Sequence, residues 1–362
     1  MLRSPCAGPG AGKQQGSEHT RMWTKQGEAP GLVVVTLNVF PGSPLPFVKG
    51  LAGSRRLSHM IRQLRQLDPD VVCLQELFCT LSRDQICSAM PEYAMYSPPH
   101  AKTQASRAIK AGTAVLWTAP VALCAYNIVS GSTAWRIFVG ASCALAALWL
   151  CWRSAIIQWI ACGSSGLAVM WHRERLRARN TQQDRFGHQL GDAMNCIIPR
   201  GYQRIELEST HAPGFGCTVL NTHLNALGND QHRDTQVLEL LEAASGRGAD
   251  TCATIVCGDM NARPHAGSIS RIRAAGYADC GVLAGHTWDE SKNSLCAGAM
   301  RVPAGRFDYI FSRCHASNRE HTRPGRARPA GVQGIRLLDC RVVLDNPSVS
   351  DHFGVCAVFQ TG

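Results

Sequence analysis

The stretch Ala253-Thr-Ile-Val-Cys-Gly-Asp-Met-Asn-Ala-Arg-Pro264 decides the predicted fold. Its apolar run from Thr254 to Cys257 is followed by Gly and, farther on, Pro, which is typical of a strand covered on both faces. Asp259 and Asn261 follow on the loop at the carboxyl end of this strand. There the acid can hold a cation or polarise a nucleophile, and the amide can donate to a substrate oxygen without adding charge. A loop Asp near an Asn is also common turn chemistry, so this stretch alone leaves both interpretations open.

Other polar residues occur in short motifs at the ends of predicted strands. The motifs are Leu37-Asn-Val39, Leu74-Gln-Glu-Leu77, Asn221-Thr-His-Leu224, Phe307-Asp-Tyr-Ile310 and Ser350-Asp-His352. Glu76 is a hard oxygen ligand that suits Mg²⁺. His352 would abstract a proton best beside a carboxylate, because the carboxylate fixes the imidazole tautomer and stabilises its charge. Each motif is common alone, but their joint occurrence favours one shared site over five unrelated loops.

In kind, order and spacing these motifs resemble the endonuclease/exonuclease/phosphatase superfamily. The resemblance implies an α/β fold, a four-layer αββα sandwich of the metal-dependent phosphoesterase type. It also implies Mg²⁺, for which Mn²⁺ can substitute, bound by Glu76, Asn38 and Asp351. In that scheme Asp308 orients His352 as the general base and Asp259 aligns the attacking water. The expected catalytic residues are His352, Asp259, Asn261, His223 and Asp308, and phosphoryl oxygens are expected to contact Asn261, Asn38 and His223.

Within that superfamily the chain looks most like the neutral sphingomyelinases. The segments that carry this likeness are Thr222-His-Leu-Asn-Ala226, Arg233-x-x-Gln236, Thr287-Trp-Asp289 with Asn293, and Asp192 followed by Arg200-Gly201. The last pair resembles the Asp…Lys-Gly switch of that branch, although Arg replaces Lys and the spacing is longer. The resemblance implies substrate contacts from Asn38, Asn293, Asp192 and Arg200. It implies Mg²⁺-dependent cleavage of a sphingophospholipid to ceramide and a phosphorylated head group.

A long apolar stretch lies inside the predicted catalytic domain. No residue between Lys110 and Arg136 is charged, and Ile137 to Trp152 is again uncharged. Two bilayer-crossing helices, about 113–130 and 137–158, would suit this length, and basic residues on both flanks place the catalytic domain on the cytosolic side. A hydrophobic insertion folded onto the protein, or a re-entrant hairpin, is the alternative. We therefore predict a disordered tail at 1–30, a catalytic domain at 31–100 and 165–362, and a membrane-hairpin insertion at 101–164.

Composition narrows the choice of partner. The formal charge is +11, with basic clusters at 172–185 and 301–328, which suits either nucleic acid or an acidic membrane surface. Solvated faces and loops explain such clusters equally well. The 17 cysteines include no C-x-x-C pair, which argues against zinc and favours a reducing compartment. Because of the apolar stretch we expect a membrane lipid substrate, an acidic membrane surface as partner and no nucleic acid.

Three other functions compete with lipid hydrolysis. A nuclease or abasic-site endonuclease would use the positive charge for phosphate contacts but has no need of the apolar stretch. An inositol-polyphosphate phosphatase is disfavoured because the Trp expected before Gly258-Asp-Met-Asn261 and a Pro-Ala-Trp-Cys-Asp-Arg motif are absent. A non-catalytic membrane scaffold would lack one of the motif residues, and none is missing. The sequence does not indicate the lipid head group or the oligomeric state.

Periodicity predicts the scaffold around these motifs. Strands are expected at 32–37, 71–74, 166–171, 204–208, 218–224, 254–257, 307–311 and 355–359, and helices at 54–67, 81–90, 230–244 and 267–275. The apolar face of the helix at 230–244 is expected to consist of Val237, Leu238, Leu240 and Leu241.

Overall fold

The computed structural model describes residues 31–40, 55–78, 80–98, 165–187, 199–226, 229–245, 251–296, 302–315 and 334–361. The tail at 1–30, the insertion at 101–164 and Asp192 lie outside these ranges, so their predicted roles stay predictions. Within the described ranges, no helix is long and apolar enough to cross a membrane.

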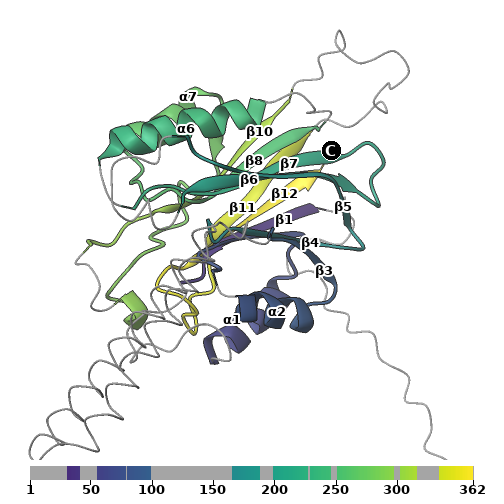
Figure 1. The fold of residues 1–362 in the computed structure, drawn as a ribbon, viewed down its shortest axis with the longest axis horizontal. Helices are drawn as coiled ribbons and strands as arrows, with labels where there is room; N and C mark the ends of the chain where they lie inside the picture. Colours follow the sequence, from purple (N-terminus) through teal and green to yellow (C-terminus); the bar gives the residue numbers. More distant parts are fainter. Residues whose placement is uncertain are drawn as a thin grey trace, which may run out of the picture.

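Two six-stranded mixed sheets pack face to face between helices (Figure 1). The first sheet has the order β11 (Ile335–Val343), β12 (Gly354–Thr361), β1 (Gly31–Asn38), β2 (Val71–Gln75), β4 (Ala168–His172), β3 (Tyr93–Tyr96). The second has the order β5 (Leu176–Arg185), β6 (Gly201–Ser209), β7 (Gly216–His223), β8 (Ala253–Asp259), β10 (Asp308–Cys314), β9 (Ala278–Asp279). Helices α1 (Arg55–Leu67) and α2 (Thr80–Ala89) cover the first sheet, and α6 (Asp230–Ser245) and α7 (Gly267–Ala274) cover the second. The predicted four-layer αββα sandwich is confirmed.

Alternation of side chains along the strands builds three separate cores. On β1, Val33 and Val35 face the helices, whereas Leu32 and Val34 face the other sheet. Because successive side chains of a strand point to opposite faces, a strand that is apolar throughout can serve two cores at once. The same holds on the second sheet, where the core between the sheets and the core beneath α6 and α7 draw on alternate residues of β8.

The strand ends that carry the motif residues meet at one edge of the sandwich, here called the polar edge. Strands β1 and β2 run parallel, as do β7 and β8, so their carboxyl ends lie together. Strand β10 runs antiparallel to β8, and β12 antiparallel to β1, which brings the starts of both to the same edge. In the second sheet His223, Asp259 and Asp308 occupy one row across three neighbouring strands. The topology therefore assembles the motif residues before any side-chain contact is considered.

Buried amides join the two sheets just below the polar edge. The side chain of Asn221 on β7 donates to the carbonyl oxygens of Leu74 and Ala168 in the other sheet, at 3.0 and 3.1 Å. Gln75 on β2 donates to Asn221 Oδ1 at 2.8 Å. Both side chains are fully buried, so losing either partner would leave polar groups without hydrogen bonds in the core. These bonds fix how far one sheet can slide over the other.

A glycine just before Asp259 allows β7 and β8 to approach closely. Gly258 has φ +137°, and a Cβ there would lie 1.9 Å from the carbonyl oxygen of Thr222. Any side chain would therefore push the strand that carries Asp259 away from the strand that carries His223.

All the predicted strands and helices are present, but the sequence missed several features. Leu238 does not belong to the buried face of α6, because it is 49% exposed. The predicted Val237 and Leu240 are buried and Leu241 is partly buried, and Gln236 and Ala244 complete the buried face. Position 238 lies about 100° around the helix from position 237, off the buried stripe. Part of the basic cluster at 172–185 is the edge strand β5, in which Arg179 pairs with Glu208. Strands β3, β9 and β11 were not predicted either.

Candidate active site

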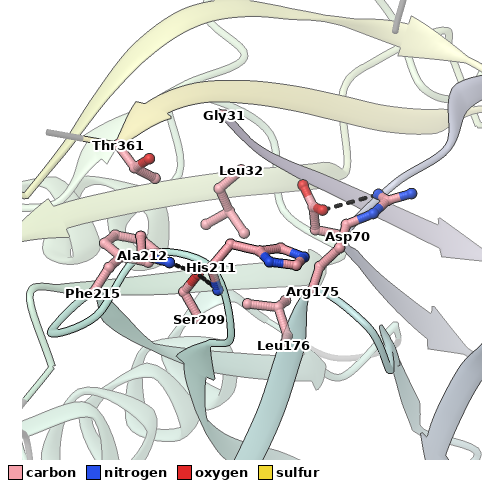
Figure 2. A pocket seen from close by; sticks show the side chains of 10 residues that line it. All are labelled: Gly31, Leu32, Asp70, Arg175, Leu176, Ser209, His211, Ala212, Phe215 and Thr361. Carbon is pink, nitrogen blue, oxygen red and sulfur yellow. Dashed lines mark hydrogen bonds and ion pairs between the residues drawn. The ribbon is translucent and has the colours of Figure 1, made fainter. Parts of the chain in front are cut away.

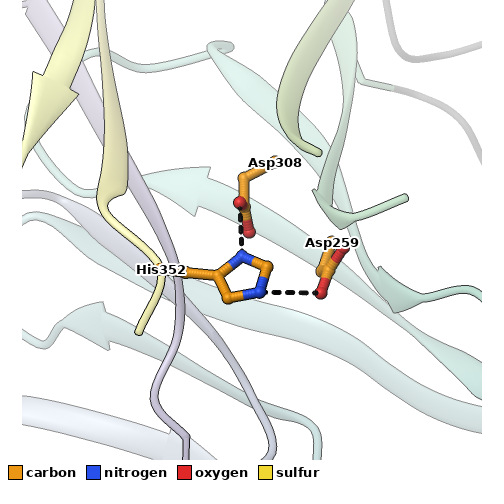
Figure 3. A group of neighbouring side chains, drawn as sticks. All are labelled: Asp259, Asp308 and His352. Atoms are coloured by element: carbon orange, nitrogen blue, oxygen red, sulfur yellow. Dashed lines mark hydrogen bonds and ion pairs between the residues drawn. The ribbon is translucent and has the colours of Figure 1, made fainter. Parts of the chain in front are cut away.

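His352 and Asp308 form a buried pair at the polar edge (Figure 3). Nδ1 of His352 donates to Oδ2 of Asp308 at 2.8 Å, and the Asp308 side chain is fully buried. Burial alone would lower the pKa of His352, but the negative charges of Asp308 and Asp259 outweigh it and raise that pKa well above its usual value. The imidazole is thus held in one orientation with Nε2 directed away from Asp308, toward Asp259 at 3.9 Å.

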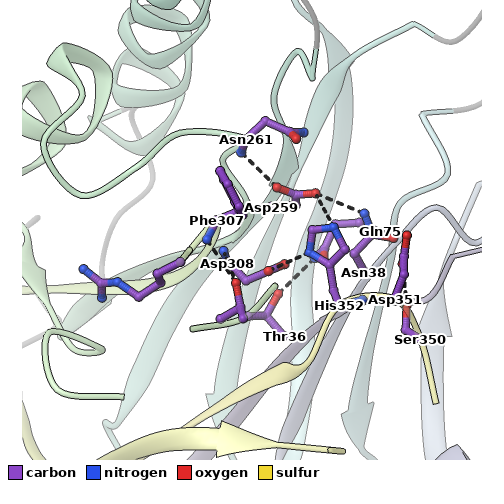
Figure 4. Close-up of polar contacts among 12 residues, drawn as sticks. Thr36, Asn38, Gln75, Asp259, Asn261, Phe307, Asp308, Ser350, Asp351 and His352 are labelled. Carbon is purple, nitrogen blue, oxygen red and sulfur yellow. Dashed lines mark hydrogen bonds and ion pairs between the residues drawn. The ribbon is translucent and has the colours of Figure 1, made fainter. Parts of the chain in front are cut away.

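Asp259 is the centre of the contacts that join the two sheets at this edge (Figure 4). Its Oδ2 accepts a hydrogen bond from Asn38 Nδ2 at 3.0 Å, across the sandwich. Its Oδ1 accepts one from the backbone N–H of Asn261 at 2.8 Å. Nε2 of His223 lies 3.4 Å from the same Oδ2. One carboxylate therefore ties together β1, β7 and the loop after β8.

The protonation state of His223 follows from its contact with Arg200. Nη1 of Arg200 lies 2.7 Å from Nδ1 of His223. A guanidinium can only donate, so Nδ1 accepts and the ring proton is on Nε2. Burial, followed by the charge of Arg200, lowers the pKa of His223 well below its usual value, which agrees with a neutral ring. His223 thus presents an N–H donor to the same space that His352 and Asp259 face.

Glu76 completes this group from the end of β2. Its backbone has φ 59°, a left-handed conformation that non-glycine residues seldom adopt, and its Oε1 lies 4.0 Å from Nε2 of His223. Burial, with the charges of Asp351 and Asp259, raises the pKa of Glu76 to about 7, against the opposing effect of Arg200 and His352. Within the described residues no group donates a hydrogen bond to this carboxylate, so both of its oxygens are free to bind a cation.

Two placements of a divalent cation are geometrically open. Ligand atoms of Asp259, Asp308 and His352 all lie within 4.8 Å of one another and could hold an ion. There, however, an ion would compete with the Asp308–His352 hydrogen bond and with the two donors already on Asp259. Among the described residues Glu76 has no such hydrogen bonds. Burial and the nearby charge of Asp351 raise its pKa, and a bound cation would offset both effects. The donor set therefore fits a divalent cation best on the Glu76 side, with Asn38 and Asp351 as the other predicted ligands.

One of the predicted substrate-binding residues, Asn293, makes its contacts elsewhere in the protein, and the prediction for another, Asp192, stays a prediction. Asp192 lies outside the described residues. Asn293 is fully buried, and its amide donates to the carbonyl oxygens of Ser350 and Asp351 while its Oδ1 accepts from the N–H of Leu295. A substrate contact therefore does not describe Asn293 in this structure, because its hydrogen-bonding positions are used within the protein. Asn38 and Arg200 do lie in the group.

Several residues that shape the site were not assigned a role from the sequence. Gln75 and Asn221 are bonded to each other beneath Glu76 and His223 and support both residues. In the sequence, each is an amide inside an otherwise apolar strand and close to a motif residue, and this could have indicated a role in the site. Thr287 accepts hydrogen bonds from the N–H groups of Phe307 and Asp308, at 3.0 and 3.2 Å. Trp288 packs edge-on against His352, with 5.0 Å between ring centroids. The Thr-Trp-Asp segment thus surrounds the His352–Asp308 pair.

A cavity of about 250 Å³ lies at the opposite end of the sandwich (Figure 2). It is lined by the start of β1, the end of β12 and Asp70, whose carboxylate pairs with Arg175 at 3.0 Å. None of the motif residues lines it, and the Asp70 carboxylate also accepts a hydrogen bond from the backbone N–H of Val33 at 2.7 Å. The site chemistry therefore belongs to the polar edge.

Comparison with known families gives one match that spans most of the chain. The model described as the Endonuclease/Exonuclease/phosphatase family matches residues 37–352. This range begins just before Asn38 and ends at His352, so it contains every described motif residue. No curated protein matches the sequence significantly.

Solved structures of low sequence identity share the fold. D. rerio TDP2 complexed with single-strand DNA product is 16% identical, with 92% of this chain and 100% of that chain covered and a TM-score of 0.56. The mannosyl-6-phosphatase of Bacteroides thetaiotaomicron is 14% identical, with 91% and 99% covered and a TM-score of 0.55. The human Nocturnin catalytic domain with bound sulfate anion is 16% identical, with 92% and 95% covered and a TM-score of 0.53. At these identities the likeness shows the fold alone.

The raised pKa of Glu76 predicts a pH-dependent gain in stability for Glu76→Gln. The rise from the usual 4.5 to about 7 corresponds to about 3 kcal/mol. Because the folded-state pKa is raised, the penalty is absent below about pH 4.5 and complete above about pH 7. In chelator at pH 8, urea unfolding should show the variant more stable by up to about 3 kcal/mol, with the gap closing toward pH 4.5.

Mg²⁺ should raise the melting temperature of the wild type but not of Glu76→Gln, since binding stabilises only the form that binds. Glu290→Gln removes an equal charge from an exposed position and serves as the control. Equal Mg²⁺ stabilisation in wild type and Glu76→Gln would exclude Glu76 as a ligand.

Proposed function

This chain belongs to the endonuclease/exonuclease/phosphatase family, whose members are divalent-metal-dependent phosphoesterases, and we propose that it is a Mg²⁺-dependent phosphodiesterase of the neutral sphingomyelinase type. Its substrate is a sphingophospholipid, sphingomyelin or a close relative, and its products are ceramide and a phosphorylated head group. The proposal combines the residues of the polar edge with the location of the apolar stretch.

The observation that carries the lipid substrate is where the apolar stretch joins the fold. The chain leaves the described fold at residue 98, after β3, and re-enters at residue 165, before β4. Both points lie at the polar edge: the N–H of Leu77 donates to the carbonyl oxygen of Gly166 at 2.8 Å, and Ser97 Oγ donates to that of Leu167 at 3.2 Å. A Cβ on Gly166 would come within 3.0 Å of the Cα of Glu76. A membrane segment attached there would bring the bilayer surface and the candidate site together.

The polar edge supplies the groups that phosphodiester cleavage needs. Neutral His352 would accept a proton from the attacking water, and Asp308 would stabilise the resulting imidazolium. The Nε2–H of His223 would donate to a phosphoryl oxygen. So would the second Nδ2–H of Asn261, since its Nδ2 donates to the carbonyl oxygen of Leu224 through one N–H. A divalent cation held by Glu76, Asn38 and Asp351 would polarise the phosphoryl group and offset the carboxylate charge that raises the pKa of His352. Asp259 would align the water between the two histidines.

The branch motifs support the site from behind. Gln236 of the Arg-x-x-Gln motif forms a reciprocal pair with Asn225: its Oε1 accepts from the backbone N–H at 3.0 Å, and its Nε2 donates to Oδ1 at 2.8 Å. Arg233 adds a bond to the carbonyl oxygen of Asn225 at 3.3 Å. These contacts hold the loop that follows His223. Arg200 contacts His223 directly. Regulation of that contact by Asp192 is a further part of the proposal.

A nuclease is the second candidate, because the chain is strongly basic and one protein of the same fold is complexed with single-strand DNA product. Part of that charge is already neutralised: Arg175 pairs with Asp68 and Asp70, and Arg179 with Glu208. The two candidates differ in substrate but share the metal and the site residues, so a substrate comparison separates them.

The test is hydrolysis of a matched panel by the purified full chain. Radiolabelled sphingomyelin and other sphingophospholipids in detergent, and single- and double-stranded oligonucleotides, are incubated with Mg²⁺. We expect phosphorylated head group from the sphingolipid, abolished by EDTA and restored by Mg²⁺. His352→Ala should lower turnover on the order of 10²–10⁴-fold, which ties the activity to the site.

Cleavage of the oligonucleotides but not of the lipids, with the same dependence on His352, would replace the lipid assignment by a nuclease. Activity that persists in EDTA would exclude the metal.

A further prediction is that the protein is embedded in a membrane with its catalytic domain at the cytosolic surface. Lys102, Arg107 and Lys110 precede the apolar stretch and several arginines follow it, so basic groups near an acidic leaflet would each add roughly 1 kcal/mol. The full chain should stay in the membrane pellet after an alkaline carbonate wash. Replacing 101–164 by a short Gly/Ser linker should release it to the supernatant and leave hydrolysis of detergent-dispersed lipid intact. Release of the intact chain by carbonate would contradict membrane embedding.

A further inference from the structure

We propose that Asn293 is a positioning residue that holds the loop of Asp351 and His352 in place relative to Asp308. This inference deepens the proposed function, because Asn293 would act on phosphodiester cleavage only through these residues. It differs from the substrate contact that the sequence resemblance implied. The 287–296 segment, of which Asn293 is part, contacts both halves of the His352–Asp308 pair.

The amide of Asn293 is bonded to two consecutive carbonyl groups of the loop. Its Nδ2 donates to Ser350 O at 2.8 Å and to Asp351 O at 3.0 Å. Its Oδ1 accepts from the N–H of Leu295 at 3.0 Å, and its own N–H bonds to Asp289 O at 2.9 Å. The side chain is fully buried. A primary amide is the only short side chain that offers two N–H donors and an acceptor together, so few replacements can preserve these contacts.

Further contacts from the same segment fix the loop from other directions. Cys296 Sγ donates to Asp351 O at 2.9 Å. The carbonyl oxygen of Thr287 accepts from the N–H of Phe353 at 2.8 Å, directly after His352. The ring of Trp288 packs against the His352 ring. The loop is thus held on both sides of the histidine by one short piece of chain.

The 287–296 segment also holds the strand that carries the partner of His352. Thr287 Oγ1 accepts from the N–H of Asp308 at 3.2 Å, where β10 begins. Asp308 and His352 come from different sheets and are 44 residues apart in sequence. Figure 4 shows Ser350, Asp351 and His352 following one another on one loop, with the His352 ring directed toward Asp308. The segment therefore sets the separation between donor and acceptor in the pair, as well as the place of Asp351.

The test compares Asn293→Asp with Ser291→Ala in the full chain. Aspartate has the same shape but presents a second oxygen to two carbonyl oxygens, so the loop should shift. A displacement of about 1 Å can cost on the order of 10²-fold in rate, so we expect kcat to fall by about that factor while KM for the lipid changes little. Within the described part of the chain Ser291 Oγ bonds to Asp289 alone, at 2.6 Å, and its removal should leave both constants unchanged.

A second readout does not depend on activity. The Nδ1 proton of His352, bonded to Asp308, should give a downfield ¹H signal in protein labelled with ¹⁵N-histidine, assigned by its absence in His352→Ala. Asn293→Asp should lose or shift this signal, and Ser291→Ala should retain it. If the wild type cleaves no lipid at all, the proposed function fails, while this signal still tests the positioning.

A folded Asn293→Asp variant with the wild-type signal and wild-type kcat would overturn the proposal. Should that variant not fold, Cys296→Ala removes one neutral hydrogen bond to the same loop. A bond of this kind is worth about 1 kcal/mol, so kcat should fall about fivefold with a shifted signal. An unchanged signal and kcat in a folded Cys296→Ala would contradict the proposal equally.

Discussion

The alignment of the two sheets is the constraint on which the site depends. Half of the group comes from each sheet: Asn38, Glu76 and His352 from the first or its connections, and His223, Asp259 and Asp308 from the second. Asn221 and Gln75 bond the sheets together in the dry interior, where an unpaired amide or carbonyl is costly. Because this register is fixed beneath the edge, Asn38 can reach Asp259 at 3.0 Å above it. A core held by apolar contacts alone would not specify that alignment so sharply.

The same edge shifts the pKa values of two histidines in opposite directions. His352 faces carboxylates, which raise its pKa, whereas His223 faces Arg200, and burial and that charge lower its pKa. Each state suits a different task, since a neutral ring with its proton on Nε2 is a donor and a ring bonded to a carboxylate can exchange a proton. Burial, followed by the neighbouring carboxylates, raises the pKa of Glu76, and a bound divalent cation would offset both effects. The carboxylate charges, a bound cation and the pKa of His352 therefore depend on one another.

The sequence predicted this site well where each residue carried its own local signal. Glu76, His223 and Asp259 each follow a buried strand, and a polar residue at such a strand end is visible without the fold. The pairing of Asp308 with His352 came from the family resemblance, since 44 residues separate them and nothing local links them. The role of Asn293 could not be foreseen, because its partners lie 57 and 58 residues away and are backbone carbonyls, which have no sequence signal. Strands β5 and β11 were missed because edge strands carry mixed polar residues instead of a continuous apolar run.

We infer that the Asp308–His352 pair and the metal ligands are separate parts of the polar edge. The most direct measurement is anomalous diffraction from crystals soaked in Mn²⁺, which locates the ion without reference to any substrate. We expect a peak within about 2.0–2.6 Å of a Glu76 carboxylate oxygen, with the His352 Nδ1 to Asp308 hydrogen bond retained. A peak bound between Asp259, Asp308 and His352, with that hydrogen bond broken, would contradict it.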